Sequence, residues 1–128
     1  MTDNQVLPEP TDLVAAFVTA FNSGSAEAVD ELYEDAAVLV PAPGQPMSGP
    51  ARSAANRHLL DFGLPMEVAV QHVYVVGDLA LLLVDWSIDG TTTAGIEIHL
   101  KATATDVARR GADGMWRYVI DNPFGVGR

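Results

Sequence analysis

The 128-residue sequence contains no cysteine. A disulfide framework, a thiolate metal site, an iron–sulfur cluster and a cysteine nucleophile are therefore excluded. Basic residues are also scarce, because seven Lys and Arg stand against seventeen Asp and Glu and give a formal net charge of -10. Such a surface repels phosphate backbones and anionic lipid, so we expect neither a nucleic-acid partner nor a membrane partner.

Long apolar runs are missing as well. The longest strictly apolar run, residues 79–84, is far shorter than the roughly 20 residues of a membrane helix. Residues 1–5 lack the basic start of a signal peptide, so we expect a cytoplasmic protein. The chain has the length of one ordinary domain and 48% apolar residues. This predicts a single domain over residues 11–128, preceded by a flexible lead-in over residues 1–10 that holds Pro8 and Pro10.

The first half of the chain has the spacing of amphipathic helices. Leu13, Phe17 and Phe21 recur every four residues, and Gly24 suits the left-handed position that ends a helix. Tyr33 has the spacing of an inward-facing residue of the next helix. The pattern predicts helices over residues 13–23, 25–35 and 50–62.

From Met66 onward the apolar residues recur with a period of two, which is typical of strands. Gly and Asp at residues 77–78, 89–90 and 110–114 indicate turns. We predict strands over residues 37–40, 66–76, 79–88, 95–109 and 115–120. Helices first and hairpin-connected strands second predict an α+β domain in which helices cover one face of a curved, antiparallel sheet.

The order of these elements, together with WRYVIDNP at residues 116–123 and GDLA at 77–80, resembles the nuclear transport factor 2-like superfamily. Within it, the chain resembles the SnoaL-like bacterial proteins over about residues 11–125. The resemblance implies a cone-shaped, cystatin-like fold in which a bent, mostly antiparallel sheet wraps three N-terminal helices. It also implies a pocket in the wide end and frequent dimerisation through the outer face of the sheet.

The chain departs from two enzyme groups of this superfamily. Ketosteroid isomerases place a proton-donating Tyr where this chain has Phe17, and an Asp base where it has Pro41. Neither residue can hold or move a proton, so the proton donor and the base of the isomerase mechanism are missing at these positions. The Arg-bridged carboxylate pair of limonene epoxide hydrolases is not evident either, because Asp85 is the only acid well inside a strongly apolar strand.

Asp121 is the first candidate for acid–base chemistry. It ends the last predicted strand, and the SnoaL-like cyclases use an Asp late in the sheet as their acid/base. Regular alternation groups Asp121 with Arg117 on the face opposite Trp116 and Tyr118, whereas a bulge would reverse this. The alternative is a structural role, with an Arg partner and a capped turn.

Asp85 and His99 are further candidates. An acid inside an apolar strand is unfavourable unless it is paired or used, so Asp85 is either catalytic or paired with a Lys or Arg on a neighbouring strand. Regular alternation lets only one of Asp85 and Trp86 face the pocket, and the family comparison favours Trp86. His99 shares a face with Glu97 and Lys101, which allows a catalytic role, a solvent face or a dimer contact.

Aromatic side chains with a polar tip suit a mostly apolar ligand site. The residues expected to line this site are Phe17, Phe21, Tyr33, Trp86, Tyr118 and Asn122. The three His residues are far apart and no Gly-rich phosphate loop is present, so we expect no metal and no other cofactor.

Two classes of function remain open. The first is a small-molecule binder or cofactor-free isomerase, cyclase or dehydratase acting on an apolar, partly cyclic ligand. The second is a non-catalytic dimerisation or partner-binding module with a plugged pocket. In either case, strands 66–76 and 79–88 are apolar on both faces, which predicts a homodimer through the outer face, with Gln71, His72 or His99 at its rim.

Overall fold

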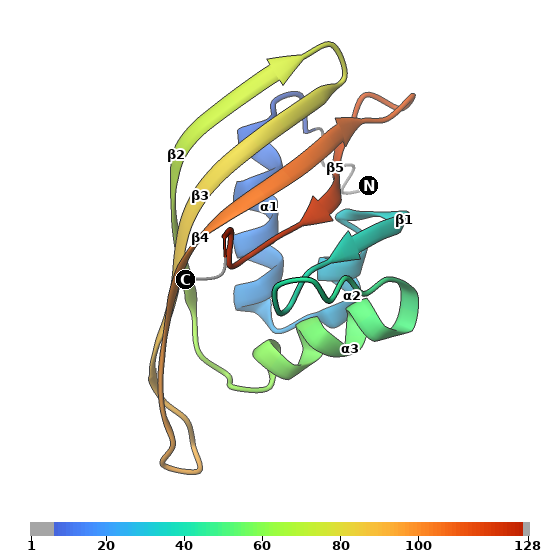
Figure 1. The fold of residues 1–128 in the computed structure, drawn as a ribbon. Helices are drawn as coiled ribbons and strands as arrows, with labels where there is room; N and C mark the ends of the chain where they lie inside the picture. The colour runs from blue at the N-terminus through green and yellow to red at the C-terminus, as the bar shows by residue number, and fades with distance from the viewer. Residues whose placement is uncertain (1–6, 127–128) are drawn as a thin grey trace.

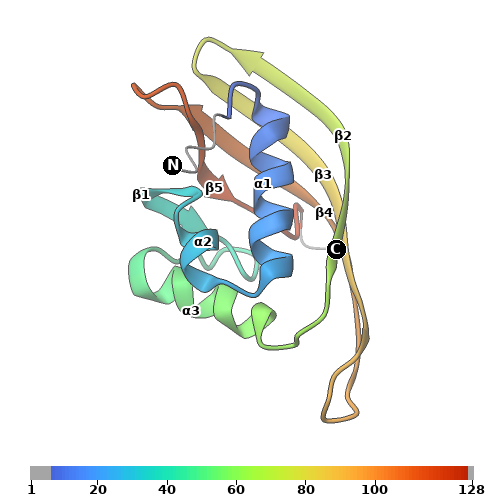
Figure 2. The same cartoon turned by 180° about the vertical axis from the view of Figure 1, so that it is seen from behind.

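The computed structural model describes residues 7–126 and confirms the predicted α+β class. Helix α1 runs along the concave side of a single five-stranded sheet, and α2 and α3 lie beside β1 (Figures 1 and 2). No helix in the described residues is long and apolar enough to cross a membrane. The elements are α1 (Pro10–Ser23), α2 (Ala26–Asp30), β1 (Tyr33–Leu39), α3 (Gly49–Leu60), β2 (Met66–Val76), β3 (Leu79–Thr91), β4 (Glu97–Arg110) and β5 (Trp116–Asp121).

The strand order is β1-β5-β4-β3-β2. Strand β1 pairs parallel with β5, and the other neighbours are antiparallel. The sheet is therefore mostly antiparallel, as the family resemblance implies. Strands β3 and β4 extend as a hairpin beyond the helices, at the bottom of Figure 1. The inner face of the sheet and one face of α1 form the core, in which Leu13, Leu82, Ile88 and Trp116 are almost fully buried.

The turn predicted at residues 89–90 is wrong. Strand β3 continues to Thr91, and the reversal lies at residues 92–96, where the backbone and hydroxyl of Thr92 pair with Ile96. Gly90 is a strand residue with a packing role, because a Cβ at this position would approach the Leu64 side chain to 2.9 Å. Gly inside a strand often marks such a close approach rather than a turn.

The second helix is shorter than predicted. Ser25 caps it as expected, with its hydroxyl accepting from the N–H of Ala28, but the helix ends at Asp30. Tyr33 therefore begins β1, because pairing with β5 overrides the helical spacing. The Tyr118 N–H donates to the Leu32 carbonyl at 2.9 Å, and Tyr33 pairs with Tyr118. The strand predicted over residues 37–40 thus begins four residues earlier.

Of the expected lead-in over residues 1–10, residues 7–10 pack onto the domain, and residues 1–6 lie outside the described part of the chain. Leu7 is buried, and the Pro8 carbonyl accepts a hydrogen bond from the Trp116 indole at 3.2 Å. Pro10 is already the first residue of α1. Contacts with β5, more than 100 residues away, hold this segment to the body of the domain.

Strand β2 contains a register shift between Val70 and His72. Val68 pairs with Trp86 and Val73 with Leu82, whereas His72 pairs with Leu83. Residues paired across antiparallel strands share a face. Val68 and Val73 therefore both point inward, and the regular alternation expected for residues 66–76 is broken at this bulge.

Candidate active site

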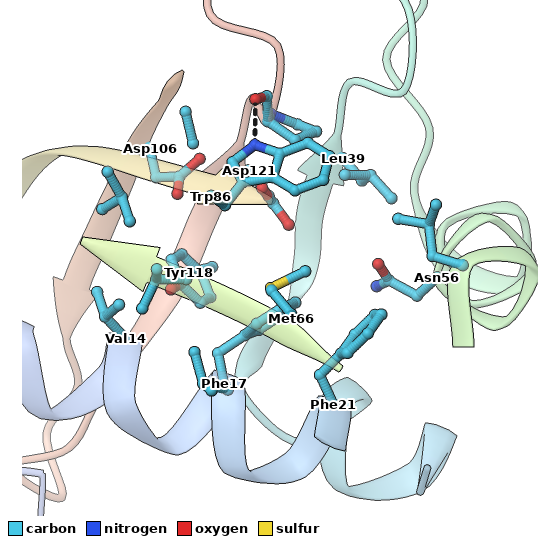
Figure 3. Close-up of a pocket in the computed structure, with 16 residues that line it drawn as sticks. Val14, Phe17, Phe21, Leu39, Asn56, Met66, Trp86, Asp106, Tyr118 and Asp121 are labelled. Carbon is cyan, nitrogen blue, oxygen red and sulfur yellow. Dashed lines mark hydrogen bonds between the residues drawn. The ribbon is translucent and has the colours of Figure 1, made fainter. Parts of the chain in front are cut away.

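A small apolar cavity lies between α1, α3 and the inner face of the sheet (Figure 3). Its volume is about 60 Å³. Phe17 and Phe21 of α1 form one wall, and Met66 and Trp86 come from β2 and β3. The polar groups are few: among the lining residues, Asn56, Asp106 and Asp121 carry amide or carboxyl groups.

Small side chains on β4 leave space for this cavity. Ala104, Asp106 and Ala108 point inward from alternate positions, and all three are buried. Trp86 covers the space from β3, and its indole N–H donates to the Pro123 carbonyl at 2.6 Å (dashed line in Figure 3). This hydrogen bond satisfies the polar edge of the ring and fixes its orientation in the wall.

A bulge in β5 turns Asp121 toward the interior. Val107 pairs with Ile120, but the next residue, Ala108, pairs with Tyr118, so Val119 is extra on β5. Tyr118 and Asp121 are consequently both buried, although regular alternation would place them on opposite faces. The structure thus realises the bulged alternative that the sequence left open.

The Asp121 carboxylate is held by a hydrogen-bonded chain. The Tyr33 hydroxyl donates to Asp121 Oδ2 at 2.5 Å, and the Asn56 amide donates to the same hydroxyl at 3.1 Å. These contacts join three elements, β1, α3 and β5. Burial raises the pKa of Tyr33 well above its ordinary value, and the nearby Asp121 charge adds to this. Tyr33 therefore stays neutral and remains a hydrogen-bond donor.

Asp106 is a second buried carboxyl group beside Asp121. One of its oxygens accepts the Asn122 N–H at 2.8 Å. Burial raises the pKa of Asp106 well above its ordinary value, and the charge of Asp121 raises it further. Burial also raises the pKa of Asp121, but hydrogen bonds from Tyr33 and Asp106 oppose that rise. Burial and the neighbouring Asp121 charge thus both favour the protonated form of Asp106.

This arrangement has a definite chemical capacity. A protonated carboxylic acid can give a proton or a hydrogen bond to a ligand oxygen, and a neighbouring carboxylate can take a proton. Both groups line the cavity, so a ligand there can meet an acid and a base together. No three His, Asp or Glu side chains gather as metal ligands within residues 7–126.

The structure brings most of the predicted site residues together. Phe17, Phe21, Trp86, Tyr118 and Asp121 line the cavity, and Tyr33 lies behind Asp121 as its hydrogen-bond donor. Asn122 does not line the cavity as expected. Its amide donates to Thr105 Oγ1 at 2.9 Å and to the Gly125 carbonyl at 3.0 Å, so the side chain fastens the turn that follows β5.

Asp85 and His99 lie away from the cavity, on the outer face of the sheet. Asp85 accepts hydrogen bonds from Gln71 at 2.7 Å and Thr103 at 2.6 Å, so neither of its partners is the expected Lys or Arg. His99 is exposed and lies against Asp89 and Glu97 near the end of the hairpin. Because the sheet separates both residues from the cavity, the candidate site contains neither.

Sequence reasoning missed Asp106 and Asn56. A signal for Asp106 was present, since residues 102, 104, 106 and 108 read Ala, Ala, Asp and Ala at alternate positions of one strand. An acid on an otherwise small, apolar face is a candidate for burial. Asn56 carried no comparable signal, because a single amide in a helix of mixed composition is usually a surface residue.

The family follows from comparison with known proteins. The model of the SnoaL-like domain family matches residues 14–119, which is most of the chain, so the chain belongs to this family. A search of curated proteins gave no significant match.

Three solved structures illustrate the shared fold. A ketosteroid isomerase-like protein from Erwinia carotovora is 22% identical, with a TM-score of 0.70, and the match covers 92% of this chain and 94% of that one. A candidate dehydratase of the NTF2-like family from Streptomyces avermitilis is 21% identical, with a TM-score of 0.65 and coverage of 85% and 88%.

The third is a candidate calcium/calmodulin-dependent protein kinase type II association domain from Thiobacillus denitrificans. It is 23% identical, with a TM-score of 0.74 and coverage of 95% and 98%. Identities at this level establish the fold and leave the function to the site.

Proposed function

We propose that the protein binds a small apolar molecule with one oxygen function and acts on it as a cofactor-free isomerase, cyclase or dehydratase. The observation that carries this proposal is the buried pair Asp106 and Asp121 at an apolar cavity. Asp121 is the base and Asp106 the acid. Two carboxyl groups in such a place are unfavourable for folding, and functional sites are where proteins retain such groups.

The cavity volume limits the ligand. About 60 Å³ is less than half of the roughly 150 Å³ of an engineered cavity that binds benzene, and well below the roughly 300 Å³ at which drug-sized pockets begin. The ligand is therefore small, or the aromatic wall of Phe17 and Phe21 moves when it enters. This small volume also favours the second candidate function, a partner-binding module in which side chains fill the cone.

Binding and chemistry are tested in sequence. Protein-detected NMR with a library of small cyclic ketones and alcohols should shift the signals of the cavity residues. Val18→Trp, at a half-buried lining position, should abolish the shifts by filling the space. A bound ketone incubated with the protein in D₂O should gain deuterium beside its carbonyl, as mass spectrometry reads directly.

The control variants separate the two functions. Asp121→Asn should stop deuterium gain, whereas Asp85→Asn on the outer face should leave it unchanged. Absence of binding by every compound would favour the plugged module. Binding without deuterium exchange would favour a small-molecule binder that is not an enzyme.

We also propose that the protein is a homodimer through the outer face of the sheet and that it acts in the cytoplasm. Tyr74, Val76, Leu79 and Leu81 expose between 41% and 76% of their surface on this face. Such a patch on neighbouring strands is typical of an interface. Sedimentation should show twice the 13.6 kDa chain mass. Leu81→Glu should yield monomers, and Ile96→Glu near the hairpin end should not.

A further inference from the structure

Arg52 is a buried cation whose position is fixed by the backbone of β1. It lies in the first turn of α3 and is only 6% exposed. One guanidinium nitrogen, Nη1, donates to the carbonyls of Glu34 and Ala37, each at 3.1 Å. These carbonyls belong to the stretch where the pairing of β1 with β5 is interrupted, between Tyr33 and Val38. Arg52 thus satisfies backbone acceptors near this interruption.

The same guanidinium stacks on the ring of Tyr33. Its central carbon lies 4.5 Å from the ring centroid, which is within the range of a cation–π contact. The hydroxyl of this ring is the donor to Asp121. Arg52, Tyr33 and Asp121 therefore form a continuous series from α3 through β1 to β5.

The positive charge of Arg52 has no direct counter-ion in the described part of the chain. None of the ion pairs within 4.0 Å includes Arg52, and its Nε has no hydrogen-bond partner there. A buried charge without a partner is strongly unfavourable. Arg52 lines an open hollow together with Asp30 and Asp35, and beyond the Tyr33 ring its charge also acts on Asp121.

Arg52 is linked to the carboxyl pair on the Asp121 side, because its guanidinium lies over the Tyr33 ring and the Tyr33 hydroxyl donates to Asp121. Burial raises the pKa of Asp121, and the Arg52 charge opposes that rise. The other titratable groups that face the pair are Tyr33 from β1 and Tyr118 from β5. The parts of α1, β2 and β3 that line the cavity contribute apolar and aromatic side chains.

We propose that Arg52 is a positioning residue of the acid–base site, which acts through the Tyr33 ring to keep the negative charge of the carboxyl pair on Asp121 and the proton on Asp106. This inference rests on the proposed function for its purpose, because it assigns the base and the acid to particular residues. Without Arg52, the proton would be divided more evenly between the two carboxyl groups. A ligand would then often meet a protonated Asp121 or an ionised Asp106.

Carbon-13 NMR of the Asp carboxyl groups, in the protein without ligand, tests the assignment. Asp121→Asn and Asp106→Asn identify the two signals. In the wild-type protein, Asp121 should ionise at lower pH than Asp106. The reverse order would overturn the proposal without the need for any Arg52 variant.

Arg52→Met should shift the ionisation of Asp121 to higher pH and reduce its separation from that of Asp106. Arg57→Met is the matched control, because Arg57 is an exposed Arg on the same helix. It should leave both signals at their wild-type positions. An unchanged Asp121 titration in folded Arg52→Met would refute the role of Arg52.

Arg52→Lys provides a second variant in case Arg52→Met does not fold. It also separates the effect of the positive charge from that of the guanidinium shape. It keeps the charge, so it should restore most of the wild-type order of ionisation. If Lys shifts Asp121 as far as Met does, the charge is not the cause and the proposal fails. Because no ligand is used, a failure here leaves the deuterium-exchange test intact, and a failure of ligand binding leaves this titration intact.

Discussion

The two faces of the central strands carry acids under opposite conditions. On the outer face, Asp85 of β3 accepts from Gln71 and Thr103 in an exposed setting. On the inner face, Asp106 of β4 is 6% exposed, and its carboxyl neighbour is Asp121. The sequence drew attention to Asp85 because its neighbours are apolar, yet the neighbours along a strand alternate between two faces. The environment of a strand residue is decided by the residues at every second position and across the sheet.

The exposed turn at residues 111–114 contains a carboxyl group whose pKa changes in the opposite direction from that of Asp106. Arg117 donates two hydrogen bonds to Asp113 and lowers the pKa of this carboxyl to about 2. Burial raises the pKa of Asp106 instead. The pKa values of two Asp side chains thus change in opposite directions, because a cation faces one carboxyl group and apolar surroundings face the other. Of the two, the group whose pKa is raised is the better suited to act as an acid.

The largest expected effect concerns packing on the two faces of β3. Leu82 is fully buried, and its neighbour Leu81 is 41% exposed. Leu82→Ala should lower the free energy of unfolding by about 2–5 kcal/mol, because it leaves a core cavity. Leu81→Ala should lower it by less than about 1 kcal/mol at protein concentrations too low for the proposed dimer to form, because Leu81 is then exposed to solvent. Urea unfolding at a series of protein concentrations measures both variants, and equal losses at the lowest concentration would contradict the difference between the two faces.

The next effect concerns the buried carboxyl pair. The unfolded pKa of Asp106 is near 3.8 and its folded pKa is raised. The folded state therefore binds the proton more tightly, and this stability is present below pH 3.8 and lost as the pH rises through the folded pKa. Asp106→Asn mimics the protonated group and should stabilise the protein near pH 8 by on the order of 1 kcal/mol.

Asp85→Asn is the control for that comparison, because Asp85 lies on the outer face, and it should change stability little. Chemical unfolding between pH 4 and pH 8 measures the three proteins. The interpretation fails if Asp106→Asn does not raise the stability at pH 8 relative to its effect at pH 4.

A smaller change in stability, with the opposite dependence on pH, is expected at Asp113. Its folded pKa of about 2 lies below the ordinary 3.8, so its contribution is present above the unfolded pKa and lost as the pH falls through the folded one. Asp113→Asn should lower the Tm slightly near pH 6 and by clearly less near pH 2. Thermal unfolding followed by circular dichroism tests this, and an equal change at both pH values would exclude the pair with Arg117 as the cause.

The smallest effect is expected at His99. Hydrogen bonds to Asp89 and Glu97 raise its pKa above 6.5. Its contribution is therefore present below pH 6.5 and lost as the pH rises through the folded pKa. All three side chains are exposed, so solvent screens the contribution strongly. His99→Gln should lower the Tm marginally near pH 5.5, with no difference near pH 9.5, and a larger loss at the higher pH would contradict this account.

Local patterns determined much of the fold. The period of four around Leu13, Phe17 and Phe21 produced α1, and the period of two from Met66 onward produced the long strands. These features depend on which side of one element is apolar, and that information is contiguous in the sequence. The order of these elements indicated the family resemblance, and the resemblance in turn implied the cone and the inward orientation of Trp86.

Tertiary pairing decided the features on which the site depends. Tyr33 has helical spacing, but the edge of β5 draws it into a strand and aims its hydroxyl at Asp121. The extra residue at Val119 turns Asp121 inward, and only its pairing with β4 determines that it bulges. Arg52 and Tyr33 come together across 19 positions of sequence because α3 lies against β1. The sequence alone therefore determined the elements and their apolar faces. The strand register and the contacts between distant segments decided which polar groups are buried together, because register and contacts depend on the segment that pairs with each strand and not on the local pattern.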